Sequence, residues 1–298
     1  MRDKKKKHRR RAAMKRRLLG RTGLDVPEIG FGCGPTAGLM VRGSAAERCA
    51  AVKRALDLGI DYFDTAPVYG ETVSEANLGE TLRALHAKPI VATKVALEAE
   101  HLGDIRGAVI RSVEASVARL GVPITLIQLH NRVGPQRAAK AEYGTGALLT
   151  VDDVLGHGGV AEAFRTLRDS GLVRFFGCSG YGGEPASVAR LIDSGAFDTI
   201  IVNYSMLNRT AWQPDGTVAR NYGGVGNRAA SAGMGVIGLR VLEGGALADQ
   251  AAAAVRFALD NRDIATLLVG FSNLGQIEAA ASFVQEEIPR SASPRNSC

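Results

Sequence analysis

The chain has 298 residues, 46% of them hydrophobic, and a formal net charge of +7. This length can bury a large core, either as two ordinary domains or as one α/β barrel of about 250 residues. The sequence has no run of about 18 apolar residues, so we expect no membrane-spanning helix and no membrane partner.

The excess positive charge lies at the amino terminus. Residues 1–17 hold 11 Lys or Arg residues and one Asp, whereas the rest of the chain holds 26 basic and 29 acidic residues. We interpret residues 1–14 as a disordered basic tail, or as a stretch upstream of a true start at Met14. They lack the apolar stretch of a signal peptide. Such a tail can bind nucleic acid or an anionic membrane, but we do not expect nucleic acid as a partner.

A hairpin is predicted next, over residues 15–28 with its turn at 21–23, and strands then alternate with helices. Short, continuously apolar segments predict buried parallel strands, and apolar residues at helical spacing predict the helices. Long loops are expected at 131–158 and 207–221. In chain order the predicted strands are 29–32, 62–64, 89–95, 124–129, 173–177, 199–204, 235–239 and 266–270, and the predicted helices are 45–58, 74–85, 104–120, 159–170, 186–194, 225–232, 248–259 and 274–284.

Eight strand-then-helix units predict an α/β fold, a (β/α)8 TIM barrel with a short N-terminal β-hairpin. We expect the barrel to occupy residues 15–288, followed by a disordered tail at 289–298. An open dinucleotide-binding sheet would instead need a G-x-G-x-x-G turn after its first strand. Pro35 interrupts that turn, and the next helix starts ten residues later.

The cysteines give little sign of a metal site. Cys33, Cys49, Cys178 and Cys298 have no metal-ligand spacing and form no close pairs. We therefore expect free thiols, a reducing cytoplasm and no bound metal.

Four residues capable of proton transfer lie at or just after three consecutive strands: Asp64, Tyr69, Lys94 and His130. Function in a barrel of this kind gathers at the carboxyl ends of the strands, which lie about 4.8 Å apart. We therefore expect these four side chains to converge on one site.

Their chemistry suggests a division of roles. Tyrosine has a pKa of about 10, and a nearby ammonium is expected to lower it, here that of Lys94. Lys94 in turn needs Asp64 as an anionic partner if it is buried. A neutral His130 can orient a carbonyl oxygen while Tyr69 donates or accepts the proton. None of these groups supplies two electrons, so a nicotinamide cofactor is implied.

Each of these residues also has a structural interpretation when taken alone. An Asp–Lys pair often stabilises a barrel, a lone histidine is more often structural, and Tyr69 lies in a turn beside a glycine. The joint placement on three successive strands is what favours catalysis.

At this point the chain resembles the aldo-keto reductases over about residues 16–285. The resemblance rests on the segments 18–24 (LLGRTGL), 55–66 (ALDLGIDYFDTA) and 171–179 (GLVRFFGCS), and on the four residues above. It implies that Asp64, Tyr69, Lys94 and His130 form the family's catalytic tetrad. Residues 149–159 (LTVDDVLGHGG) are similar to the branch that contains aldose 1-dehydrogenases of the galactose and fucose type.

The resemblance also implies a set of dinucleotide contacts, with departures from the family pattern. Gly180 and Ile201 stand where the family has Asn and Gln, and Asn203 is the candidate substitute. Residues 271–276 lack the cation that holds the 2′-phosphate of NADP, so NAD or NADP is expected with a lean toward NAD. The expected cofactor-binding residues are Gly32, Ser179, Asn203, Tyr204, Leu239, Arg240, Gly244, Gly245, Gly270, Ser272, Asn273 and Gln276.

Polar residues of the two long loops are candidates for substrate contacts, namely Asn131, Arg132 and Arg209. Mobile surface connections are the alternative interpretation of these loops. The sequence thus predicts a cytoplasmic oxidoreductase that transfers a hydride between NAD(P)(H) and a small aldehyde, ketone or sugar C1. The alternative is a non-catalytic dinucleotide-binding sensor or regulatory subunit on the same fold.

Overall fold

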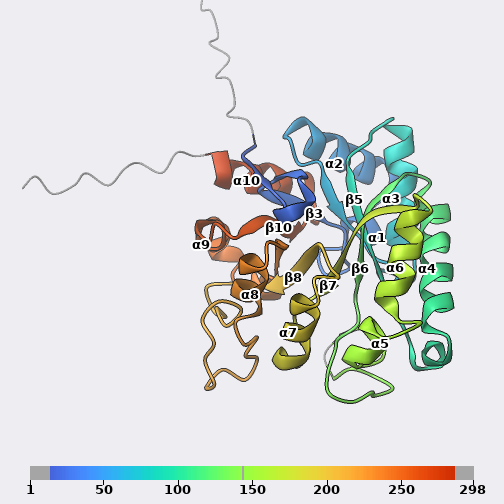
Figure 1. The fold of residues 1–298 in the computed structure, drawn as a ribbon. Helices are drawn as coiled ribbons and strands as arrows, with labels where there is room; N and C mark the ends of the chain where they lie inside the picture. The colour runs from blue at the N-terminus through green and yellow to red at the C-terminus, as the bar shows by residue number, and fades with distance from the viewer. Residues whose placement is uncertain (1–13, 143, 286–298) are drawn as a thin grey trace, which may run out of the picture.

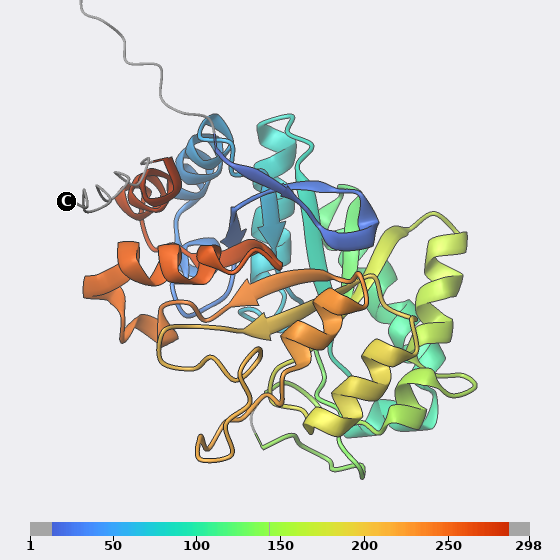
Figure 2. The same ribbon diagram turned by 60° about the vertical axis from the view of Figure 1, so that its left-hand side comes forward.

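Eight parallel strands form a closed barrel in the computed structural model, which describes residues 14–142 and 144–285 (Figures 1 and 2). The strands close in the order β10-β3-β4-β5-β6-β7-β8-β9, and the fold is the predicted one. Their bounds are β3 Ile29–Gly32, β4 Tyr62–Asp64, β5 Ile90–Val95, β6 Ile124–Leu129, β7 Val173–Ser179, β8 Thr199–Asn203, β9 Gly235–Leu239 and β10 Ile264–Gly270.

Helices surround the barrel, because each crossover between parallel strands packs a helix on the outside of the sheet. They are α1 Leu39–Arg42, α2 Ala45–Asp57, α3 Val73–Ala84, α4 Ile105–Leu120, α5 Val151–Leu155, α6 Val160–Asp169, α7 Pro185–Asp193, α8 Val225–Ser231, α9 Ala251–Asp260 and α10 Leu274–Gln285, together with the 3₁₀ turns η1 Gly20–Thr22, η2 Ala99–Gly103, η3 Glu243–Gly245 and η4 Ala248–Gln250. Within the described residues, no helix is both long and apolar enough to cross a bilayer.

Several local predictions need correction. The helix predicted over 74–85 begins one residue earlier, at Val73, so that Ser74 lies inside α3 with its side chain fully buried. The loop at 131–158 contains α5, and residues 39–42 form the short helix α1. Met14 is not part of a tail, because it is only 6% exposed and packs against Gly59. The predictions for residues 1–13 and 286–298 lie outside the described residues.

A hairpin covers the end of the barrel where the strands begin (Figure 2). Strand β1, Arg16–Leu18, pairs antiparallel with β2, Asp25–Pro27. The Arg17 guanidinium lies between Glu28 and the backbone carbonyls of Leu259 and Ile264, which precede or begin β10. The loops that connect each strand to the next helix lie at the opposite end, where the strands finish.

Strand register sets which side chains share that open end. Asp64 pairs with Ala92, and Lys94 lies two residues further along β5, where it pairs with Gln128. Residues two apart on a strand point to the same face. Asp64, Lys94 and Gln128 therefore occupy neighbouring strands near the mouth of the barrel.

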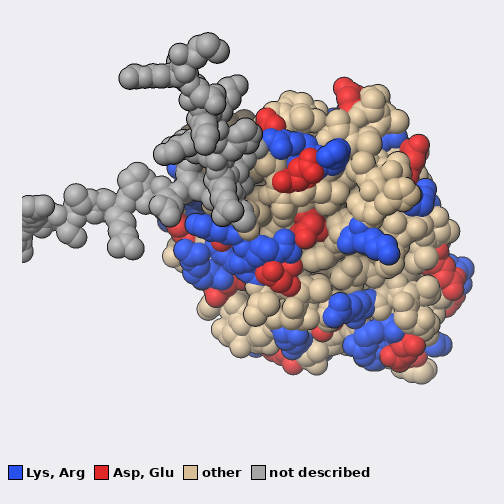
Figure 3. All heavy atoms as spheres, turned by 90° about the horizontal axis from the view of Figure 1, so that it is seen from above, with Lys and Arg blue, Asp and Glu red and all other residues tan. Residues whose placement is uncertain are grey.

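Seen from above, the surface carries a strip of Lys and Arg side chains with acidic side chains set among them (Figure 3). Ion pairs on the described surface include Arg16–Asp25, Lys53–Asp57 and Arg54–Glu278. These pairs are partly exposed, so each contributes about 0–1 kcal/mol to the free energy of unfolding.

Candidate active site

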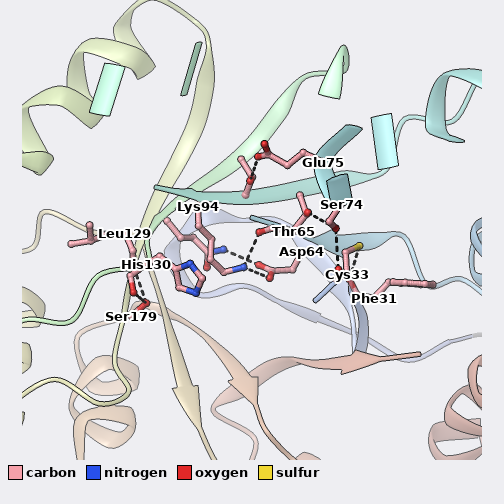
Figure 4. Close-up of polar contacts among 12 residues, drawn as sticks. Phe31, Cys33, Asp64, Thr65, Ser74, Glu75, Lys94, Leu129, His130 and Ser179 are labelled. Carbon is pink, nitrogen blue, oxygen red and sulfur yellow. Dashed lines mark hydrogen bonds and ion pairs between the residues drawn. The ribbon is translucent and has the colours of Figure 1, made fainter. Parts of the chain in front are cut away.

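A buried ion pair lies at the centre of the barrel mouth (Figure 4). Lys94 Nζ donates to Oδ1 of Asp64, and also to the carbonyl oxygen of Thr65 at 2.8 Å. Gln128 Nε2 donates to the second carboxylate oxygen of Asp64 at 2.9 Å. The Lys94 and Asp64 side chains are 2% and 3% exposed, so each charge depends on the other for its stability. Sequence reasoning missed Gln128, although it lies two residues before His130 and therefore on the same face.

Tyr69 reaches this pair from the turn between β4 and α3. The turn is held by Ser74, whose hydroxyl donates to the carbonyl oxygen of Cys33 at 2.9 Å. The centroid of the Tyr69 ring lies 4.9 Å from Lys94 Nζ and 5.9 Å from the centroid of the His130 ring, which meets it edge-on. The structure thus brings all four predicted catalytic residues together.

The expected lowering of the Tyr69 pKa by Lys94 is not found. Burial raises the pKa of the Tyr69 phenol, and the negative charge of Asp64 raises it further. Lys94 lies near the ring, and its positive charge is offset by Asp64. The phenol is therefore held protonated at neutral pH, which suits a group that gives a proton to a carbonyl oxygen.

His130 follows β6, and its backbone N–H donates to the carbonyl oxygen of Val95 at 2.8 Å. The residue is 7% exposed. Burial lowers the pKa of the imidazole to about 3, and the positive charges of Lys94 and Arg132 act in the same direction. The ring is therefore neutral at physiological pH and carries one N–H donor. Its Nδ1 has no hydrogen-bond partner within the described part of the chain.

Polar groups on the ends of β6, β7 and β8 fit a nicotinamide carboxamide. Asn203 Oδ1 and Gln128 Oε1 are buried and have no partner among the described residues. The Asn203 amide nitrogen donates to the Tyr222 hydroxyl at 2.9 Å. Ser179 Oγ donates to the carbonyl oxygen of Leu129 at 2.8 Å and can still accept a hydrogen bond. A buried acceptor without a donor is costly, so these oxygens suit a ligand that brings N–H groups.

Three predicted ligand contacts lie elsewhere in the structure. Tyr204 stacks on Phe257 of α9, on the outside of the barrel, with ring centroids 5.4 Å apart. The guanidinium of Arg209 covers the same Phe257 ring at 4.6 Å. Asn131 is fully buried, and its amide bonds to the backbone of Leu97 and Ala147. In the described structure these side chains brace loops and an outer helix, and their contact with a ligand stays a prediction.

The other residues predicted to hold the dinucleotide lie at or just after the ends of β3, β9 and β10. Gly32 pairs with Gly270, so both lie at the barrel mouth. Ser272, Asn273 and Gln276 bond to one another around the start of α10. Their contact with a dinucleotide stays a prediction, as it does for Leu239 at the end of β9 and for Arg240, Gly244 and Gly245 after it.

Arg132, in contrast, faces the mouth. Its guanidinium carbon lies 5.7 Å from the centroid of the Tyr181 ring. Tyr181 follows β7 and is 8% exposed. Tyr181 and Tyr222 were not among the predicted site residues, since the sequence gives no spacing signal for either.

A model of the aldo/keto reductase family matches residues 28–251 of the chain. The chain is 26% identical to L-galactose dehydrogenase of Arabidopsis thaliana, over 91% of this chain and 88% of that protein. It is 31% identical to pyridoxal 4-dehydrogenase of Microbacterium luteolum over 55% of each protein.

Among solved structures, an aldo-keto reductase from Bacillus halodurans in its holo form matches with a TM-score of 0.70 at 23% sequence identity. The match covers 94% of this chain and 93% of that one. At this identity the likeness establishes the (β/α)8 fold.

Proposed function

The chain belongs to the aldo/keto reductase family, and from this premise we propose that it interconverts a carbonyl and an alcohol with a nicotinamide dinucleotide. The observation that carries the proposal is the contact of Tyr69 with Lys94 and His130 above the buried Asp64. This arrangement places a proton donor and a neutral hydrogen-bond donor at one point of the barrel mouth.

The four residues then have separate tasks. Tyr69 donates its phenolic proton to the carbonyl oxygen in reduction, and in oxidation its phenolate form accepts the proton of the alcohol. His130, kept neutral by burial, holds the same oxygen through its N–H. Lys94 provides positive charge beside the phenol and so stabilises the phenolate that remains after proton transfer. Asp64, fixed by Gln128, keeps Lys94 in place.

A bound NAD(P)H would supply the hydride. The residues suited to hold its carboxamide are Ser179, Asn203 and Gln128, whose free acceptor oxygens support this assignment. We favour NAD(H) over NADP(H), because residues 271–276 contain no Lys or Arg to bind a 2′-phosphate.

The dehydrogenases of L-galactose and of pyridoxal among the relatives support a small polar substrate with an aldehyde, hemiacetal or alcohol group. We further propose a reducing cytoplasm as the compartment, since Cys33, Cys49 and Cys178 are free thiols.

Replacement of Tyr69 by Phe tests the proton route. We expect Tyr69→Phe to lower kcat by about 100-fold or more, because a general acid is removed, with the dinucleotide dissociation constant unchanged within twofold. The matched control is Tyr62→Phe on β4, which removes a buried hydroxyl without a partner in the described structure. The readouts are initial rates over sugars, polyols and pyridine alcohols with NAD and with NADP, and fluorescence titration with NADH and NADPH.

Turnover of Tyr69→Phe within tenfold of wild type would show that the proton takes another route. A preference of tenfold or more for NADP(H) would overturn the cofactor assignment. Dinucleotide binding by the wild type without turnover of any substrate would favour a sensor or regulatory subunit.

A further inference from the structure

Arg132 is a buried cation without a counter-ion in the described structure. The residue is 9% exposed, and its Nε and Nη1 are buried with no hydrogen-bond partner among residues 14–142 and 144–285. The described groups that act electrostatically on Arg132 are two tyrosines and two arginines, and none of them is a carboxylate. A buried charge is stable only when it is paired, so the site is complete only with an anion from outside the described chain.

The surrounding backbone is shaped to hold this guanidinium. A Cβ atom on Gly182 would lie 2.3 Å from Arg132 Cζ, and a Cβ atom on Gly144 would lie 2.6 Å from Arg132 Nε. Both glycines have positive φ, +73° and +141°. Tyr181 provides a ring face on which the cation stacks. Two glycines and one ring thus form a fitted cradle.

The cradle is next to the reacting groups. Asn131, between His130 and Arg132, bonds through its side chain to the backbone of Leu97 and Ala147. Tyr181, on which Arg132 stacks, interacts electrostatically with Tyr69 and Lys94. The charge of Arg132 contributes to the lowered pKa of His130. Tyr222, which also interacts electrostatically with Arg132, accepts a hydrogen bond from Asn203 and can therefore donate its own proton to a ligand.

We propose that Arg132 binds an anionic group, a carboxylate or a phosphate, on the carbonyl substrate; this assignment rests on the proposed oxidoreductase function. The physiological substrate is then an aldehyde or ketone, or the corresponding alcohol, that carries such a group. The dinucleotide is the other source of a phosphate. The residues expected to hold its phosphates follow β9 and β10, whereas Arg132 follows β6. Arg240, which follows β9, is close enough to act electrostatically on Arg132, so the test below also measures dinucleotide binding.

Paired substrates test the proposal: 4-oxobutanoate against butanal, and glyceraldehyde 3-phosphate against glyceraldehyde. We expect wild type to show a kcat/KM at least tenfold higher for the anionic member of each pair. Arg132→Gln should lower kcat/KM for the anionic member by about 10- to 100-fold, mostly through KM, because hydrogen bonds to charged groups are lost. Its kcat/KM for the neutral member should fall by much less, so that the ratio between the two members of each pair drops toward one.

Two further variants test whether the preference for the anionic substrate depends on the charge at position 132. Arg132→Lys should keep part of the preference for anions, because the charge is retained. Arg190→Gln, which removes an exposed arginine on α7, should leave both kcat/KM values unchanged.

Three results would overturn the assignment. If wild type has the same kcat/KM for both members of each pair, Arg132 does not bind an anionic group of the substrate, and the proposed oxidoreductase function is unaffected. A tenfold weaker binding of NADH or NADPH by Arg132→Gln, with an unchanged ratio between the pairs, would assign the anion to the dinucleotide. If wild type turns over no carbonyl compound at all, calorimetric titration with succinate and with inorganic phosphate measures anion binding directly. Equal binding by wild type and Arg132→Gln would exclude an anion site at Arg132.

Discussion

The protonation of His130 connects the chemistry of the site to the stability of the protein. Its pKa is lowered to about 3 in the folded state by burial and by neighbouring positive charges, whereas an unfolded histidine has a pKa of about 6.5. Between these values the unfolded chain binds a proton that the folded protein does not. Stability is therefore lost as the pH falls below about 6.5, at up to about 1.4 kcal/mol per pH unit.

When the pH is lowered from 6 to 4, the free energy of unfolding should fall by about 2 kcal/mol less in His130→Gln than in wild type. The control is His157→Gln, whose histidine side chain is fully exposed and which should follow the wild-type pH dependence. Urea unfolding at several pH values measures the difference. Parallel pH dependences for His130→Gln and wild type would mean that His130 takes up its proton without cost in the folded state.

For single residues, the sequence predicts where a site residue lies along its strand better than it predicts the surroundings of its side chain. Asp64, Lys94 and His130 could be placed because each marks a point where an apolar strand ends. The direction of the Tyr69 pKa could not, because it depends on burial and on how far Asp64 offsets Lys94. The bracing role of Asn131 could not be predicted either, because it depends on backbone groups of Leu97 and Ala147, which are distant in the sequence.

At the scale of elements, a close contact between α3 and α4 depends on a glycine. A Cβ atom on Gly79 of α3 would lie 2.2 Å from the carbonyl oxygen of Leu120, the last residue of α4. Alanine favours a helix over glycine by about 1 kcal/mol, but overpacking costs about 1–3 kcal/mol. Because the contact is with rigid backbone, we expect Gly79→Ala to destabilise the protein by about 1–2 kcal/mol in urea unfolding.

Gly103→Ala is the matched control, since Gly103 ends η2 with open space around its Cα and no positive φ. It should change the free energy of unfolding by less than about 0.5 kcal/mol. Equal values for the two variants would show that α3 and α4 separate without cost.

Helix spacing placed the main helices in the sequence, but their ends depended on tertiary contacts. Ser74 resembles an N-cap, yet its hydroxyl bonds to Cys33 and Thr65 inside the protein, and the helix begins at Val73 instead. The short helix α5 was missed because five residues give too little periodicity to stand out within a long loop.

At the scale of the whole molecule, stability and chemistry occupy opposite ends of the barrel. The tetrad lies where the strands finish, and the hairpin closes the end where they begin, as is usual for this architecture. The sequence could predict this division, because eight strand-and-helix units fix the topology and the hairpin precedes the first barrel strand. It could not predict that Arg17 joins the hairpin to β10, a contact between residues more than 240 positions apart.

This separation predicts that the hairpin can be weakened without loss of catalysis. Arg17 is 13% exposed at its side chain, pairs with Glu28, which is 6% exposed, and donates to three backbone carbonyls. Arg17→Met leaves these groups unpaired, so we expect a loss of about 3–5 kcal/mol in the free energy of unfolding. Arg16→Met, which breaks two partly exposed ion pairs, should cost only about 0–1 kcal/mol. In both variants kcat/KM per folded molecule should equal that of wild type, because the hairpin and the tetrad lie at opposite ends of the barrel. A fall in kcat/KM with Arg17→Met, at a temperature where the variant remains folded, would mean that the two ends of the barrel are coupled.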